Sequence, residues 1–291
     1  MNLRDPLLEL RGVTKNYEGF ELKPLDLFLE RGYIMGFIGE NGAGKTTTIK
    51  SIMNLIQLDG GEILVDGLDS VQHEKAVKEK IGFVFDDMHF YEFLKMDQMT
   101  EIIRRFYPRW DQGLYKKTIK RFDLPANKKI KEMSSGMKMK YCLATALSHG
   151  AELILLDEPT SGLDPVFRSE LLEIFQDLIS SGERSIFFSS HITSDLDQVA
   201  DYISLIHRGQ LIFSEDQETI RDRFHLVKGG ISQWNPLAEK ACYGVRKNEI
   251  SFSGLTSDVA TVRKYIPGDV VIEPANLEEI MIHIARGENH A

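Results

Sequence analysis

Residues able to bind a phosphate group stand at 39–46, where the sequence reads Gly-Glu-Asn-Gly-Ala-Gly-Lys-Thr. The pattern of a glycine, four residues and then Gly-Lys-Thr is a P-loop. Its glycines let consecutive backbone N–H groups turn toward an anion, and the helix that follows adds unpaired N–H groups and the positive end of its dipole. We expect Lys45 to reach the β- and γ-phosphates and the Thr46 hydroxyl to bind Mg²⁺. The expected nucleotide contacts are Gly39, Glu40, Asn41, Gly42, Ala43, Gly44, Lys45, Thr46 and Thr47.

The residues on either side of this loop fit such a role. The mostly apolar run 33–38 predicts a buried strand, and 44–55 predicts a helix. The alternative is a glycine-rich turn before a helix, which the strand, the lysine and the threonine together disfavour.

Three further apolar runs end in polar residues. They are 81–85 before Asp86, 153–156 before Asp157 and Glu158, and 186–190 before His191. Strands that alternate with helices predict a mostly parallel sheet, in which ligands bind beyond the carboxyl ends of the strands. If these strands are parallel neighbours, their polar ends surround one phosphate site.

Each polar residue suits one task at that site. Asp157 follows four apolar residues, the Walker B arrangement, and is expected to hold Mg²⁺ directly or through water. Glu158 stands one residue further, where a carboxylate acts as general base or positions the attacking water. His191 is expected to contact the γ-phosphate. The alternatives are an acidic pair that merely starts a loop and a loop histidine with local partners.

Composition limits the class of protein. The formal net charge of −9 and a pI near 5.5 argue against a nucleic-acid partner. Two cysteines, Cys142 and Cys242, without paired spacing fit a reducing cytosol and provide no metal site. No apolar run approaches the roughly 18 residues of a membrane helix, and residues 1–6 do not form a signal peptide.

The rest of the chain frames this site. We expect strands at 7–13 and 20–29 in an antiparallel β subdomain, and a helical insertion at about 88–148. Residues 1–220 then form an α/β domain, and 221–291 form a small α+β domain. For that smaller domain we predict strands at 249–252 and 269–272, a helix at 256–265 and a capping box from Asn276 to Glu279.

With these motifs in order over residues 7–215, the chain resembles the ATP-binding subunit of ABC transporters, which are P-loop NTPases. The resemblance places Tyr17, otherwise a surface tyrosine in a turn, where the family stacks an aromatic ring on the base. It places Asp86 in the Q-loop, where the family has glutamine, so that Asp86 would contact Mg²⁺ unless Asp87 has taken that role. Residues 133–137 match the Leu-Ser-Gly-Gly-Gln signature in part, and 161–164 match the D-loop. The signature residues are Ser134, Ser135, Gly136 and Met137, and the D-loop acid is Asp164.

The resemblance implies an ATPase that works in pairs, each ATP lying between the Walker A loop of one copy and the signature of the other. The partner would be a second copy or a close paralogue. A separate membrane permease would hold the pair at the cytoplasmic face of the cell membrane. The lone ATP-binding domain and the C-terminal extension are most similar to bacterial ABC-2-type exporter subunits. The alternatives are an importer ATPase and an ABC ATPase that acts on ribosomes or nucleic acid.

Overall fold

The structure, a computed structural model, describes residues 6–84, 90–266 and 268–287. Its contacts divide the chain into two units, Met1–Ser214 and Glu215–Ala291. We call them unit 1 and unit 2. The division falls inside the last strand of unit 1, a little before the boundary expected at 220/221.

The central sheet of unit 1 has six strands in the order β10-β9-β3-β8-β7-β6. Its strands are β3 (Ile34–Ile38), β6 (Ile81–Val84), β7 (Leu153–Leu156), β8 (Ser185–Ser190), β9 (Tyr202–His207) and β10 (Gln210–Asp216). Strand β3 pairs in parallel with β8 and β9, and β7 pairs in parallel with β6 and β8. All residues of β3, β7 and β8 are buried, which explains the near-continuous apolar sequences of β3 and β7 and the apolar run 186–188 inside β8. The predicted parallel sheet is confirmed.

A second sheet of four strands lies against the first, in the order β2-β1-β4-β5. Its strands are β1 (Pro6–Tyr17), β2 (Phe20–Glu30), β4 (Gly60–Val65) and β5 (Leu68–Asp69), and every pairing is antiparallel. The structure corrects one expectation here. Tyr17 is the last residue of β1 and pairs with Phe20, so the turn contains only Glu18 and Gly19.

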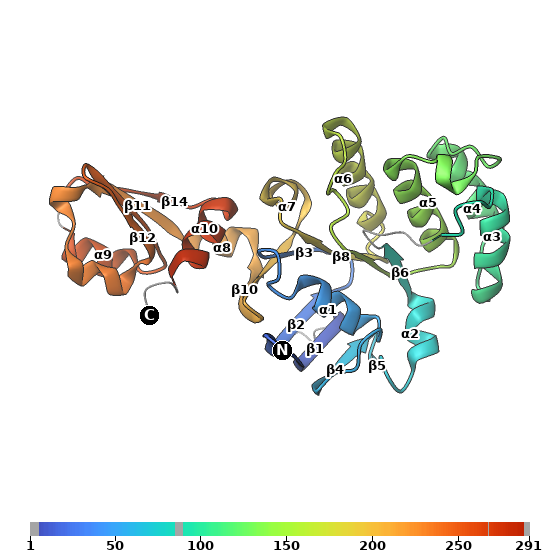
Figure 1. Cartoon of the computed structure of the whole chain (residues 1–291), viewed down its shortest axis with the longest axis horizontal. Helices are drawn as coiled ribbons and strands as arrows, with labels where there is room; N and C mark the ends of the chain where they lie inside the picture. Colours follow the sequence, from blue (N-terminus) through green and yellow to red (C-terminus); the bar gives the residue numbers. More distant parts are fainter. Residues whose placement is uncertain (1–5, 85–89, 267, 288–291) are drawn as a thin grey trace. The chain divides into compact units, whose positions relative to one another are not determined.

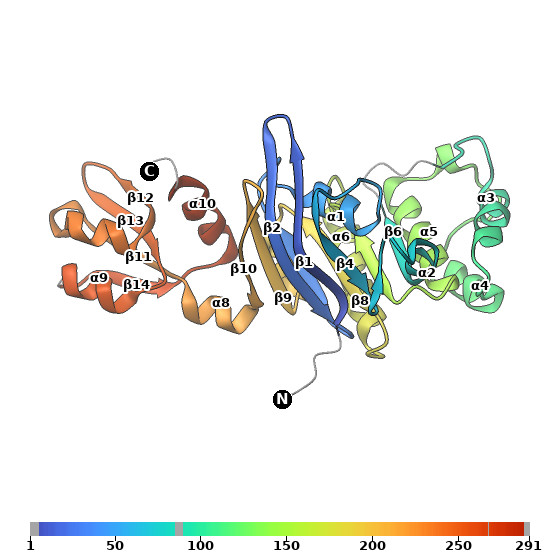
Figure 2. The ribbon, with the colours of Figure 1, turned by 90° about the horizontal axis from the view of Figure 1, so that it is seen from below.

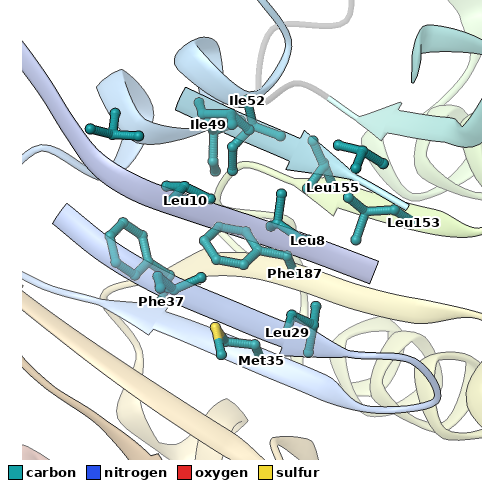
Figure 3. Close-up of a cluster of buried hydrophobic side chains, with 14 of the residues drawn as sticks. Leu8, Leu10, Leu29, Met35, Phe37, Ile49, Ile52, Leu153, Leu155 and Phe187 are labelled. Carbon is teal, nitrogen blue, oxygen red and sulfur yellow. The ribbon is translucent and has the colours of Figure 1, made fainter. Parts of the chain in front are cut away.

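The main core of unit 1 fills the space between the two sheets. Leu8 and Leu10 from β1 meet Phe37 from β3 and Phe187 from β8, together with Ile49 from helix α1 (Lys45–Ile52) (Figure 3). The Phe37 and Phe187 rings lie 5.3 Å apart, center to center. Because α1 packs into this core, the loop before it is fixed against the end of β3. Helix α1 ends at Ile52, earlier than the predicted residue 55.

The other face of the six-stranded sheet is covered by helix α6 (Pro165–Ile179), whose Phe175 contacts Phe188 of β8. The remaining helices of this part are α2 (Glu74–Lys80) and α7 (Thr193–Val199). Helices α3 (Met96–Ile103), α4 (Gln112–Arg121) and α5 (Ser135–Ser148) gather beside β6 as the helical insertion (Figures 1 and 2). In the described parts of the chain, no helix is long and apolar enough to cross a membrane.

A buried histidine in the insertion gives stability a pH dependence. His149 follows α5, is 5% exposed and stacks on the Tyr107 ring at 3.9 Å between ring centers. Burial lowers the pKa of His149 from 6.5 to about 4. As the pH falls below 6.5, the unfolded chain therefore protonates His149, whereas the folded chain does so only near pH 4. The free energy of unfolding decreases as the pH falls between these two values.

We expect the wild type to lose about 1 kcal/mol more stability than His149→Phe between about pH 7.5 and 5.5. Phenylalanine keeps the aromatic stack and removes the titrating group. Urea unfolding at both pH values measures the difference, and parallel losses in the two proteins would exclude His149 as the cause.

Unit 2 holds a four-stranded antiparallel sheet in the order β12-β13-β11-β14. Its elements are helix α8 (Gln217–Arg223), strands β11 (His225–Gly230), β12 (Tyr243–Lys247), β13 (Ser251–Thr256) and β14 (Val271–Pro274), and helices α9 (Val259–Tyr265) and α10 (Leu277–Gly287). Val227 and Phe252 pack with Val262 of α9 and with Ile266, which directly follows α9, into a small separate core.

Sequence patterns described unit 2 only in part. The capping box is present, because Asn276 Oδ1 accepts from the Glu279 N–H at 2.9 Å and Glu279 Oε2 accepts from the Asn276 N–H at 3.0 Å. The helix expected from 256 begins at Val259, because residues 251–256 continue β13. Strands β11 and β12 were not predicted.

Candidate active site

The predicted P-loop joins β3 to α1, and its shape depends on glycine. Gly44 has φ +117°, a conformation that L side chains rarely adopt. Gly39 has no room for a side chain, because a Cβ there would lie 2.3 Å from the Ile206 carbonyl oxygen. The loop therefore folds back over β9, and α1 begins at Lys45 without a side-chain cap on its first N–H groups.

Lys45 is 6% exposed and has three acceptors around its ammonium. Its Nζ lies 2.8 Å from the Gly39 carbonyl oxygen, 3.3 Å from that of Glu40 and 3.2 Å from Glu158 Oε1. The cation is thus held at the mouth of the loop and contacts Glu158, which follows β7, the second strand from β3 in the sheet. An anion that enters the loop meets a positive charge already in place.

The order β3-β8-β7 brings the predicted polar ends together. Glu158 Oε2 lies 2.7 Å from His191 Nδ1 and 3.3 Å from the His191 backbone nitrogen. Because an ionised carboxylate only accepts hydrogen bonds, His191 carries a hydrogen on Nδ1. Both oxygens of Glu158 are therefore engaged, one by Lys45 and one by His191, beside the P-loop.

Ser189 is a site residue that the sequence analysis missed. It is fully buried in β8, and its Oγ donates to Asp157 Oδ1 at 2.6 Å and accepts from the Glu158 N–H at 2.9 Å. The available signal was the serine pair 189–190 that follows the apolar run 186–188. That signal became meaningful only once the register of β7 and β8 was known.

A pocket of about 330 Å³ opens over the loop. Its lining residues are Phe20, Glu40, Asn41, Gly42, Gly44, Lys45, Thr46, Thr47 and Glu158. Phe20 is the aromatic side chain in this wall, and it also was missed. Tyr17, which pairs with Phe20 across the β1–β2 turn, is 46% exposed, and the Lys15 Nζ lies 5.3 Å from its ring center. Stacking of Tyr17 on a base stays a prediction.

The signature residues open helix α5. Ser134 is the N-cap, and its Oγ accepts from the Met137 N–H at 3.2 Å. Gly136 packs closely on α6, since a Cβ there would lie 2.9 Å from the Phe167 ring. Ser134 and Ser135 are exposed, so this helix start presents its N–H groups to the surface rather than to the pocket of its own chain.

Asp164 of the D-loop has a structural task in this chain. Its carboxylate accepts from the N–H groups of Val166 and Phe167, both at 3.1 Å, and so caps α6. The neighboring Val166 is 80% exposed. The turn thus holds an apolar side chain and an acid at the surface.

The described oxygen donors suit Mg²⁺. Thr46 is exposed at the start of α1, and Asp157 Oδ1 is fixed by Ser189. Mg²⁺ is commonly held by one or two protein oxygens together with substrate phosphates. Among the described residues, no group of three or more acids, histidines or cysteines is placed to hold a metal ion. The third predicted ligand, Asp86, and its alternative Asp87 lie outside the described residues.

Comparisons with known proteins agree with this geometry. Residues 22–161 match the family model for "ABC transporter". The chain is 33% identical over 219 residues to the ABC transporter ATP-binding protein YtrB of Bacillus subtilis (strain 168), covering 75% of each chain. It is 34% identical over 214 residues to the bacitracin transport ATP-binding protein BcrA of Bacillus licheniformis, covering 71% of this chain and 68% of that one.

A solved structure, the ATP-binding subunit of an ABC transporter, superposes with a TM-score of 0.68 at 25% identity, over 74% of this chain and 92% of that one. These likenesses cover the P-loop, the Walker B strand and the fold that joins them. The chain belongs to the ABC transporter family, as an ATP-binding subunit that hydrolyses ATP.

Proposed function

We propose that this subunit drives a membrane exporter, with ATP binding closing a pair of subunits and hydrolysis reopening it. The observation that carries the hydrolytic part is Glu158, which lies beside the pocket between Lys45 and His191. The similarity to the bacitracin transport ATP-binding protein supports a role in transport. The direction, export, rests on the resemblance of the lone ATP-binding domain and C-terminal extension to ABC-2-type exporter subunits.

Glu158 is the general base in this proposal. Its Oε1 contacts the Lys45 ammonium, and its Oε2 is held by His191. Phosphate oxygens bound in the loop compete for that ammonium, which leaves Oε1 able to accept a proton from water. His191 keeps the carboxylate aimed while this exchange takes place.

Bound Mg²⁺ would neutralise charge on the phosphates, and Thr46 and Asp157 are the described residues that would hold it. Asp157 suits this task because the Ser189 hydroxyl holds one of its oxygens. The charge of Lys45 complements the metal at the same phosphates.

The partner subunit would complete the site. The start of α5 at Ser134 and the D-loop at Asp164 lie on the surface, and the chain holds one copy of each motif. Paired with a second copy or a close paralogue, the α5 N-terminus would present its dipole and N–H groups to the γ-phosphate.

The permease would dock on an aromatic and basic strip of the helical insertion. Residues 91–95 run antiparallel to 128–131, with a bridge between Lys95 and Lys129 and a hydrogen bond from the Lys131 N–H to the Glu92 carbonyl. Tyr91 and Phe93 are 67% and 77% exposed, and the Lys131 Nζ lies 5.0 Å from the Phe93 ring center. Phe90, by contrast, packs on Tyr141 inside the insertion.

Co-expression with the permease encoded by a neighboring gene tests this proposal. We expect the subunit in the membrane fraction and co-purified with the permease, with ATPase activity stimulated by the exported compound. Phe93→Asp should weaken the co-purification, whereas Val71→Asp, at another exposed apolar residue, should not. Co-sedimentation with ribosomes instead, without membrane recovery, would contradict a role in transport.

Removal of unit 2 tests whether unit 1 alone binds ATP. A chain ending at Asp216, the last residue of β10, keeps every described residue of the site. We therefore expect ATP affinity within about twofold of wild type, with altered pairing or coupling to the permease instead. Fluorescent-nucleotide titration measures the affinity. Loss of binding in a truncated chain that still unfolds cooperatively would show that unit 2 contributes to the site.

A further inference from the structure

One buried hydroxyl connects the two carboxylates of the site. Ser189 Oγ donates to Asp157 Oδ1 at 2.6 Å and accepts the Glu158 backbone N–H at 2.9 Å. The serine is fully buried, and Asp157 is 7% exposed, so water does not readily replace either bond. The Ser189 oxygen thus binds both the Asp157 carboxylate and the backbone N–H of Glu158.

The peptide at Glu158 needs such support. Glu158 has φ +49°, in the left-handed region that side-chain-bearing residues seldom adopt. A conformation of this kind persists only when its surroundings fix it. The Ser189 oxygen fixes the N–H at the start of the strained residue, and this sets the direction in which the Glu158 side chain leaves the strand.

The chemistry of the link is specific to a hydroxyl. It must donate one hydrogen bond and accept another from nearly the same position, and serine does both. An alanine would leave the Glu158 N–H and an Asp157 oxygen unpaired in the interior. A thiol of similar volume donates and accepts only weakly.

We propose that Ser189 is a positioning residue for hydrolysis, which through one hydroxyl fixes the Asp157 carboxylate for the metal and the Glu158 backbone for catalysis. The inference rests on the proposed roles of Asp157 and Glu158. It adds a residue outside the P-loop, Walker B, signature and switch-histidine motifs. Groups that orient a metal ligand commonly change metal affinity or activity by 10- to 100-fold when they are lost.

The test compares Ser189→Ala, Ser189→Cys and Ser204→Ala in the full chain. Ser204 is the matched control, because it is also fully buried and pairs with the same β3 residue, Phe37, from the other side. Its Oγ bonds Ser214 at 2.7 Å and the Met35 sulfur at 3.4 Å, not the acids. Thermal unfolding establishes that each variant is folded.

We expect both Ser189 variants to lose kcat by on the order of tenfold and to need more Mg²⁺ for half-maximal activity, while Mg²⁺-free ATP affinity stays within about twofold. Fluorescent-nucleotide titration without Mg²⁺ measures that affinity, and titration with Mg²⁺ should show a weaker gain than in wild type. Ser204→Ala should resemble wild type in all three measurements.

Two results would overturn the proposal. One is normal kcat and Mg²⁺ dependence in Ser189→Cys, which would mean that volume matters and hydrogen bonding does not. The other is an equal loss in Ser204→Ala, which would mean that any buried serine of the sheet has this effect. Glu158→Gln, measured alongside, separates this inference from the proposed function: normal turnover there removes the general base whatever Ser189 does.

Discussion

Glu158→Gln is expected to lower the rate of ATP hydrolysis by on the order of 100-fold or more while ATP still binds. Glutamine keeps the size of the side chain and can still accept the hydrogen bond from His191. It cannot take a proton from water, and it removes the charge that faces Lys45. The lysine is then freer for phosphate, so the paired, ATP-bound form should accumulate.

Single-turnover hydrolysis, nucleotide titration and size-exclusion chromatography with ATP measure the three parts of this result. Glu183→Gln is the control, because this exposed glutamate precedes β8 at the end opposite His191. Near-normal turnover in Glu158→Gln would remove Glu158 from the catalytic role. A comparable loss in Glu183→Gln would indicate a general effect of lowering the negative charge.

The parts of the site that the sequence predicted are those that local chemistry determines. A P-loop must have glycine at Gly44, where φ is +117°, and at Gly39, where a Cβ would collide with β9. Asp157 and Glu158 end a strand of four buried apolar residues, and parallel pairing places such ends at one edge. Residue types and their spacing therefore predict the P-loop, the acids Asp157 and Glu158 and the parallel sheet without knowledge of contacts between distant segments.

The parts that were missed depend on pairing between distant segments. Ser189 reaches Asp157 only because β8 lies beside β7 in the observed register. The serine type alone does not indicate such a role in the sequence. Phe20 of β2 lies over the P-loop, close to Gly44, because the antiparallel sheet packs against the six-stranded sheet. In unit 2, β11 contains Gly229 and Gly230, and β12 contains Arg246 and Lys247, so both lack the apolar alternation that predicts a strand.

Two inactive variants are expected to regain activity when they are mixed, if the chain pairs with a second copy of itself. Lys45→Ala removes the cation at the phosphates, and Ser134→Arg puts a bulky side chain at the α5 N-cap, so each should be nearly inactive alone. In the proposed pair, Lys45 acts in its own chain's site, and Ser134 acts in the partner's. A mixed pair then has both defects in one site and none in the other.

Random pairing of equal amounts gives mixed pairs half the time, so recovery of about a quarter of wild-type activity is expected when one sound site works alone. Lys45→Ala mixed with Glu158→Gln is the matched control. Both residues belong to the same half of a site, so every mixed pair has a defect in each site, and no recovery should follow. ATPase assays on mixtures, with pairing verified by two affinity tags, measure both cases. Recovered activity in the mixture of Lys45→Ala and Glu158→Gln would contradict the proposed sharing of sites across the pair. So would a lack of recovery in the mixture of Lys45→Ala and Ser134→Arg when mixed pairs are shown to form.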